Sequence, residues 1–159
     1  MRTSSREVQL DAIDRSILNE LQADGRLSNQ DLAGRVHLSP SACLRRVKAL
    51  QDAGVIAGYV ALLNPKAVGR HGTSYTIINL ESTQPAQLEV FEQAVRDTPE
   101  ILDCVYVAGA NDYLLRFAYR DAEDLERFHA EVLARLPGVV RSNSMLVLRT
   151  VKKTTALAM

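Results

Sequence analysis

The hydrophobic pattern of this chain changes once, near residue 55, and this change restricts the folds that the chain can adopt. Before it, apolar residues recur at three- and four-residue steps, which is the repeat of amphipathic helices. After it, strand-like stretches alternate with two longer helical repeats. Because 159 residues suffice for two small domains, we expect a helical domain followed by a mixed one, together an α+β protein.

The first part of the chain predicts three short helices. The first covers residues 10–24, where one apolar stripe runs up to a glycine. Ser28 stands three residues before Asp31, which is a capping-box-like start for a second helix. Ser39 can cap a third helix, since Pro40 fits the first helical position, where an N–H is not needed. A short helix, a tight turn and a further helix are typical of a helix-turn-helix.

The second part predicts the order βαββαβ. Right-handed crossovers then give a four-stranded antiparallel, ferredoxin-like sheet with both helices on one face. The opposite face carries side chains such as Tyr75 and Ile77 or their alternates, and apolar residues there need a partner, so we expect self-association. A strand-like segment at 55–64 predicts a wing strand, and 69–72 predicts a hinge. The expected strands are 74–82, 101–108, 113–119 and 140–151, and the expected helices are 85–97 and 122–136.

One side of the third helix is apolar and the other is cationic. On the cationic side small residues allow close approach to a DNA groove, and Arg45 can donate two hydrogen bonds to a guanine or hold a phosphate. Such a helix can also be an ordinary solvated surface helix, and the helix-turn-helix context favours DNA binding. The apolar side is expected to hold Cys43, Leu44, Val47 and Leu50. The candidate DNA contacts are Ser28, Asn29, Ser39, Ser41, Ala42, Arg45, Arg46 and Lys48.

The formal net charge of zero hides a difference between the two parts of the chain. Residues 1–72 hold ten basic and seven acidic side chains, a net charge of +3, whereas residues 73–159 hold nine and twelve, a net charge of −3. Such asymmetry can mark the half that binds an anion. The excess is modest, so we expect one DNA-binding domain by itself to bind DNA weakly and in a salt-sensitive manner, and multivalent assembly to raise the affinity.

Several sequence strings follow one another in order along nearly the whole chain. They are Leu10-Asp11-x-Ile13-Asp14-Arg15-x-Ile17-Leu18-x-x-Leu21-Gln22-x-Asp24-Gly25-Arg26, Leu38-Ser39-Pro40-Ser41-x-Cys43-Leu44-x-Arg46-Val47, Gly54-Val55-Ile56-x-Gly58-Tyr59-x-Ala61-Leu62-Leu63-Asn64-Pro65, Gly109-x-x-Asp112-Tyr113-Leu114-Leu115 and Leu136-Pro137-Gly138-Val139. In order and spacing they resemble the leucine-responsive regulatory protein/AsnC (feast/famine) family of transcription regulators.

The resemblance implies a sequence-specific, DNA-binding regulator built from two domains. Residues 1–55 would form the helix-turn-helix domain, 56–73 a wing strand and linker, and 74–159 a domain for effector binding and oligomerisation. The implied partners are double-stranded DNA, further copies of the chain and a small-molecule effector, namely an amino acid. Dimers would assemble into octamers or other higher oligomers.

The loop that joins the second and third expected strands is the candidate effector site. A glycine there lets backbone N–H groups approach a carboxylate, and Asp112 can bind an ammonium group. A plain β-turn is the alternative, since these residue types are common in turns. In the family the residue before the aspartate is often aromatic, so Asn111 alters the size and polarity of the implied pocket. The candidate effector contacts are Gly109, Ala110, Asn111, Asp112 and Tyr113.

His37 stands in the turn of the helix-turn-helix, where the family commonly has glycine. We expect a positive φ there, which histidine tolerates better than most residues do. We expect no metal site and no cofactor other than an amino-acid effector, because the sequence has no Cys/His cluster. Cys43 and Cys104 lie in apolar segments of different expected domains and predict buried thiols rather than a disulfide.

Two other classes of protein remain as alternatives. A small metabolic enzyme is one, although the sequence contains no nucleophile elbow, phosphate loop or zinc motif, so we expect no catalytic residues. A ligand-binding or protein-interaction module without DNA binding is the other. The longest apolar runs, such as Val60–Leu63, are too short to span a bilayer, and Met1–Gln9 lacks the apolar stretch of a secretory signal. We therefore expect a soluble, cytoplasmic protein.

Overall fold

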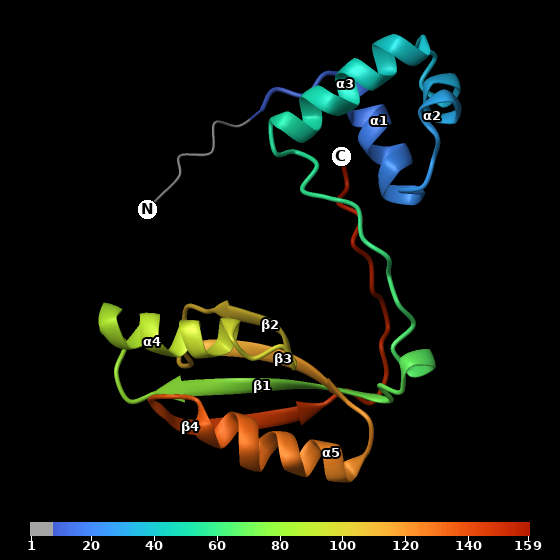
Figure 1. Cartoon of the computed structure of the whole chain (residues 1–159). Helices are drawn as coiled ribbons and strands as arrows, with labels where there is room; N and C mark the ends of the chain where they lie inside the picture. The colour runs from blue at the N-terminus through green and yellow to red at the C-terminus, as the bar shows by residue number, and fades with distance from the viewer. Residues whose placement is uncertain (1–7) are drawn as a thin grey trace. The chain divides into compact units, whose positions relative to one another are not determined.

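The computed structural model describes residues 8–159, and contacts between Cα atoms separate the chain into two units. One unit runs to Ala61 and also includes Lys152–Met159, and the other covers Leu62–Val151. Three helices are followed by the order βαββαβ, as the sequence predicts (Figure 1). Most of the N-terminal segment for which we expected no secretory signal, residues 1–7, lies outside the described residues.

The first unit contains helices α1 (Ala12–Ala23), α2 (Asn29–Arg35) and α3 (Pro40–Asp52). The predicted caps are confirmed: the Ser28 Oγ accepts the Asp31 N–H at 3.1 Å, and the Ser39 Oγ accepts the Ala42 N–H at 3.3 Å. His37 has a φ of 56°, as predicted for this turn. The buried apolar side chains of the three helices form one core, which comprises Ile17, Leu18, Leu32, Ala33, Val36, Cys43 and Leu50.

The wing strand that we expected at 55–64 is not formed in the described chain. The segment is extended and ends in a short 3-10 turn, η1 (Lys66–Val68). Val55 and Ile56 pack against the helical core, whereas Tyr59, Val60, Leu62 and Leu63 are exposed. No neighbouring strand among the described residues is hydrogen-bonded to the segment. The prediction was wrong because the pattern of β-branched and aromatic residues reports only a local preference, whereas a strand also needs a neighbour for its backbone hydrogen bonds.

The second unit is an antiparallel sheet in the order β2-β3-β1-β4. Its strands are β1 (Gly72–Leu80), β2 (Ile101–Tyr106), β3 (Tyr113–Tyr119) and β4 (Val139–Leu146), and its longer helix is α4 (Pro85–Arg96). One buried cluster joins the sheet to both helical segments, which therefore cover the same face. The members of that cluster are Ile78, Leu80, Phe91, Tyr113, Leu115, Phe117, Phe128, Leu133 and Leu136.

The helix expected at 122–136 changes its winding along its length. It begins as α5 (Ala122–Arg127), widens into a π turn, η2 (Phe128–Val132), and ends in a 3-10 turn, η3 (Leu133–Arg135). The sequence predicts a buried stripe that includes Val132. Val132 packs against the core but is only partly buried, and its neighbour Leu133 is fully buried. Because the turn is wide, the buried residue that follows Phe128 on the core-facing side is Leu133, five positions later. The Phe128 ring stacks on Phe117 with 3.7 Å between centroids.

The face of the sheet that points away from the helices is open in the described chain. Alternation along β1 places Ile78 and Leu80 in the core and Tyr75 and Ile77 on the open face, as predicted. Tyr75 is 38% exposed and pairs across the strands with Met145, which is also exposed. Among the described residues no helix combines the length and hydrophobicity needed to span a membrane.

Candidate nucleic-acid interface and effector site

Helix α3 presents its predicted polar side to solvent. Cys43 and Leu50 are buried, whereas Ser41, Arg45 and Lys48 are exposed. Arg45 and Lys48 form no ion pair among the residues of the described part of this unit. Since these positions lie three and four residues apart, they share one helix face and form a continuous cationic strip.

Leu44 was placed wrongly by the sequence analysis. We expected it on the buried side, but it is 58% exposed. A step of about 100° from Cys43 carries it out of the contact with α1 and onto the edge of the face that holds Ser41 and Lys48. An exposed leucine beside these polar residues adds an apolar contact to the strip, of the kind that can pack on a thymine methyl group.

Several of the candidate DNA contacts build the turn between α2 and α3. The Asn29 Nδ2 donates to the Pro40 carbonyl at 2.8 Å, which ties the start of α2 to the start of α3. Ser28 and Ser39 use their hydroxyl oxygens as helix caps. Ala42 is half-buried on the flank of the exposed strip. Ser28, Asn29 and Ser39 thus hold the turn through their hydrogen bonds, although Ser28 and Ser39 are also exposed.

Arg46 faces the first helix rather than the exposed strip. Its guanidinium donates to Asp11 at 2.8 Å and to Asp14 at 2.7 Å, and the side chain is 31% exposed. The hydrogen bonds that the guanidinium donates to Asp14 and Asp11 raise the pKa of Arg46, and the hydrogen bond from the Asp14 backbone N–H is the largest cause that lowers the pKa of Asp11. Asp11 and Asp14 also form the capping box of α1. Arg46 therefore joins α3 to the start of α1 and helps to position α3.

The expected effector loop is tied to the end of β1 by Asp112. One of its carboxylate oxygens accepts the Leu80 N–H at 2.8 Å, and its own N–H donates to the Ile78 carbonyl at 3.1 Å. The Ala110 carbonyl accepts the Asn79 side-chain amide at 3.1 Å, and Gly109 has a φ of 136°. The loop is thus a fixed turn, held by backbone groups, that leaves the second Asp112 oxygen without a described partner.

Tyr113 points into the core. The side chain is almost fully buried, and its hydroxyl donates to Glu92 of α4 at 2.7 Å. Burial is the main cause that raises the pKa of this phenol, and the hydrogen bond to Glu92 adds to it. Tyr113 therefore anchors the loop to α4, while Asn111 and Asp112 remain half-exposed beside it.

A cavity of about 250 Å³ lies at the same end of the sheet. Leu80 belongs both to its wall and to the hydrogen bond with Asp112. The cavity lies between the β1–α4 connection and the turn before β4. A hydrogen bond from the Glu81 N–H to the Gly138 carbonyl joins these two segments. The sequence analysis found only the string around Pro137 and Gly138 and missed the rest. The lining residues are Leu80, Glu81, Ser82, Gln87, Val90, Pro137 and Gly138.

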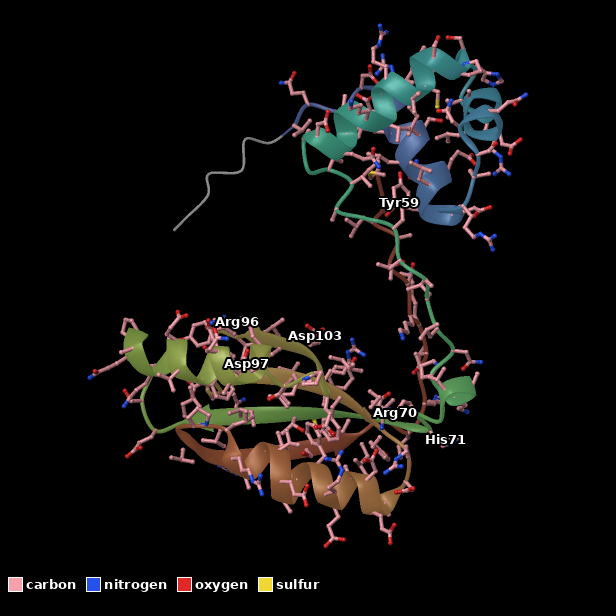
Figure 2. The ribbon with its side chains drawn as sticks, viewed as in Figure 1. Tyr59, Arg70, His71, Arg96, Asp97 and Asp103 are labelled. Carbon is pink, nitrogen blue, oxygen red and sulfur yellow. The ribbon has the colours of Figure 1, made fainter. Side chains whose placement is uncertain are left out.

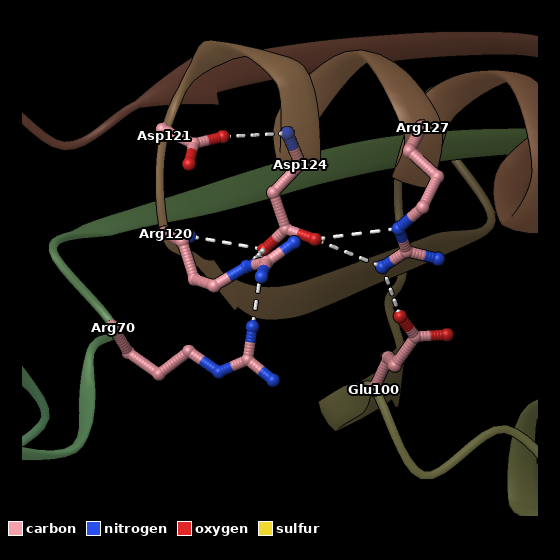
Figure 3. A network of polar contacts seen from close by, with 6 residues as sticks. All are labelled: Arg70, Glu100, Arg120, Asp121, Asp124 and Arg127. Carbon is pink, nitrogen blue, oxygen red and sulfur yellow. Dashed lines mark hydrogen bonds and ion pairs between the residues drawn. The ribbon is translucent and has the colours of Figure 1, made fainter.

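A polar cluster that the sequence analysis missed surrounds Asp124 in α5 (Figure 3). Asp124 is 4% exposed, and its carboxylate binds Arg70 at 3.0 Å, Arg120 at 3.5 Å and Arg127 at 3.0 Å. The backbone N–H of Arg120 and the guanidinium groups of Arg127 and Arg120 lower the pKa of Asp124 to about 2. Arg70 comes from the loop just before β1, beside His71 (Figure 2), so the cluster fixes the entry of the chain into the sheet.

Comparisons with known families and structures agree with this arrangement. The family model described as winged helix-turn-helix DNA-binding matches residues 10–57, and the model of the Lrp/AsnC ligand binding domain matches residues 73–157. The leucine-responsive regulatory protein of Escherichia coli is 43% identical over 148 residues, which cover 93% of this chain and 90% of that protein.

Solved structures extend the similarity to three dimensions. A transcriptional regulator from Neisseria meningitidis in complex with L-methionine is 39% identical, with a TM-score of 0.89 over 94% of this chain and 97% of that one. An AsnC family regulator from Agrobacterium tumefaciens has the same TM-score and coverage at 33% identity.

Fold, helix-turn-helix and ligand-binding domain together define an effector-modulated, DNA-binding transcription regulator. The chain belongs to the Lrp/AsnC family. Its relatives are transcriptional regulators, so the chain is a regulator and not an enzyme.

Proposed function

We propose that the exposed strip of α3 reads duplex DNA and that an amino acid bound beside Asp112 alters the assembly or the DNA binding of the protein. The observation that carries the first part is the exposure of Arg45 and Lys48 on a helix whose opposite side is buried. As a regulator that reads genomic DNA, the protein acts in the cytoplasm of a bacterial or archaeal cell.

The strip assigns different roles to its residues. Arg45 contacts base edges, since it lies near the middle of the strip and a guanidinium can donate two hydrogen bonds to guanine. Ser41 and Lys48 flank it and contact backbone phosphates, which set the register of the helix on the duplex. Ala42 allows close approach. Ser28, Asn29 and Ser39 act through the turn that they hold, and Arg46 acts through its ion pairs with α1.

Substitution of Arg45 tests the DNA-binding proposal. Arg45→Ala is expected to weaken binding to the cognate operator about 5- to 150-fold, the equivalent of about 1–3 kcal/mol. Arg15→Ala is the matched control, because Arg15 is an exposed cation of the same unit on α1. Gel-shift titrations at one salt concentration measure both variants. Equal operator affinity of Arg45→Ala and the native chain contradicts the assignment.

The effector site combines the loop 109–112 with the adjacent cavity. The Asp112 oxygen that has no hydrogen-bond partner among residues 8–159 can accept hydrogen bonds from an ammonium group, and backbone N–H groups near Gly109 can bind a carboxylate. A volume of about 250 Å³ and a partly apolar wall suit a small amino acid with an aliphatic side chain. The relative that was solved with L-methionine supports an effector of this class.

A thermal-shift screen with the common amino acids tests the effector. A ligand that binds the folded protein raises Tm, and at 100 times its Kd it stabilises the fold by about 2.7 kcal/mol. Asp112→Asn keeps an acceptor for the Leu80 N–H but removes the charge, so it is expected to abolish most of the shift. A shift that survives in Asp112→Asn, or a ligand that leaves DNA binding unchanged, contradicts the proposed switch.

The open face of the sheet supports self-association. It carries Tyr75, Ile77 and Met145, and burial of such apolar side chains stabilises a dimer. A dimer presents two recognition helices and reads an imperfect palindrome, and dimers assemble further into octamers or other higher oligomers. Sedimentation of Tyr75→Lys against the native chain tests this: a monomer is expected, and an unchanged distribution contradicts the use of this face.

A further inference from the structure

The segment that follows the second unit returns to the first. Residues 152–159, the C-terminal tail, belong to the unit of the helix-turn-helix and not to the domain whose last strand precedes them. The Gln22 Nε2 donates to the Leu157 carbonyl at 3.0 Å, and the Gln22 Oε1 accepts the Leu157 N–H at 2.6 Å. One side-chain amide thus satisfies both backbone groups of one tail residue, as a neighbouring strand would, and holds the tail beside α1 (Figure 1).

The tail raises the net positive charge of the helix-turn-helix unit. Residues 1–61 hold eight basic and seven acidic side chains, a net charge of +1. The tail adds Lys152 and Lys153 and no acidic residue, which brings the unit to +3. Within the unit, Arg35 and Arg46 are already paired with carboxylates. Both tail lysines are exposed and form no ion pair in the described chain.

The contact at Gln22 keeps the two lysines near the helix-turn-helix. Leu157 lies four positions after Lys153 and five after Lys152, so the chain between them spans at most about 14 Å and about 18 Å. The shorter of these lengths is similar to the diameter of one helix with its side chains, about 10–12 Å. The lysines therefore stay within about 18 Å of this contact, as part of the unit to which residues 152–159 belong, for as long as Leu157 remains bound.

We propose that the tail is a second DNA-contacting element, in which Gln22 holds the segment in place and Lys152 and Lys153 bind backbone phosphates. The proposal rests on the DNA binding proposed above and adds contacts from outside the helix-turn-helix. Phosphate contacts by lysine are independent of sequence, so the tail contributes affinity and not operator choice.

The salt dependence of DNA binding tests the lysines. Each lost phosphate contact lowers the slope of log affinity against log salt by about 0.9, so Lys152→Gln/Lys153→Gln is expected to lower it by nearly 2 for operator and for random DNA alike. Lys66→Gln is the matched control, because it removes an exposed lysine from η1 in the other unit, and it leaves the slope unchanged. A native slope in the double variant overturns the proposal while native DNA binding itself stands.

Substitution of Gln22 tests the attachment of the tail. Gln22→Met keeps the size of the side chain and removes both hydrogen bonds to Leu157, so the slope is expected to fall although both lysines remain. Adding this change to the lysine pair then lowers the slope no further. An unchanged slope in Gln22→Met, with normal thermal unfolding, overturns the role of Gln22. If the native chain shows no salt-dependent DNA binding, the proposed function fails first.

Discussion

The two units use their charged side chains in opposite ways. In the helix-turn-helix unit the ion pairs lie at the surface near helix ends, and α3 keeps Arg45 and Lys48 unpaired among the described residues. In the sheet unit three arginines converge on one buried carboxylate, Asp124. The first unit thus offers positive charge to a partner, and the second uses it to hold its own loops. Net charge per unit, +3 against −3, reflects this division.

Removing the buried carboxylate should produce the largest effect on stability. Asp124→Asn leaves three guanidinium groups without their counter-charge, and loss of one partner of a buried ion pair costs about 3–5 kcal/mol. The arginines are each more than a third exposed, so water compensates in part and we expect about 2–4 kcal/mol. Denaturant unfolding measures it. Asp103→Asn, an exposed partner of Arg116, is the control and should change stability by less than about 0.5 kcal/mol.

The same carboxylate should make stability depend on acid pH. The folded-state pKa of Asp124 is about 2, below the value of about 3.9 for an unfolded aspartate. Its contribution is therefore complete above about pH 4 and is lost as the pH falls towards 2, with a total of about 2 kcal/mol. Between pH 2 and 6 the free energy of unfolding should depend less steeply on pH for Asp124→Asn than for the native chain. Parallel curves would contradict the assignment to this group.

Substitutions of Arg45 and Arg46 should have smaller effects than loss of Asp124, and the two should differ in kind: one changes DNA binding and the other changes stability. Arg46→Gln removes the ion pairs with Asp11 and Asp14, so we expect a fall in Tm of a few degrees and only a minor change in the salt slope. Arg45→Gln should leave Tm unchanged and weaken operator binding. Thermal unfolding and salt titrations of both variants measure this. If Arg46→Gln lowers the salt slope as strongly as Arg45→Gln does, the division between a positioning and a contacting arginine is wrong.

Features set by neighbours along the chain could be predicted from the sequence, and features set by distant partners could not. Ser28 and Ser39 cap their helices through groups three residues away, and the positive φ of His37 is a property of one turn. By contrast, Arg70 meets Asp124 across 54 positions, and no local pattern marks either residue. In the same way, no local pattern showed that Arg46 pairs with Asp11 and Asp14, because these carboxylates lie at the start of another helix.

The candidate effector site shows the same limit. The loop 109–112 was found from its glycine and aspartate, but the cavity beside it is made of segments that the sheet brings together from three parts of the chain. The sequence also could not show that one oxygen of Asp112 binds the Leu80 N–H. That bond fixes where a second hydrogen-bonding partner can approach the carboxylate.

The π turn at Phe128–Val132 contains one residue more than an α-helical turn needs to connect the same two buried positions. Phe128 and Leu133 face the core from positions five apart, and Leu136 follows three later. Deleting a single residue between the first two would place them four apart, which is the step of an uninterrupted α-helix, and Phe128, Leu133 and Leu136 could all stay on the buried face. Alignments of shorter relatives should therefore open a one-residue gap here rather than in a loop, with no loss of the buried stripe.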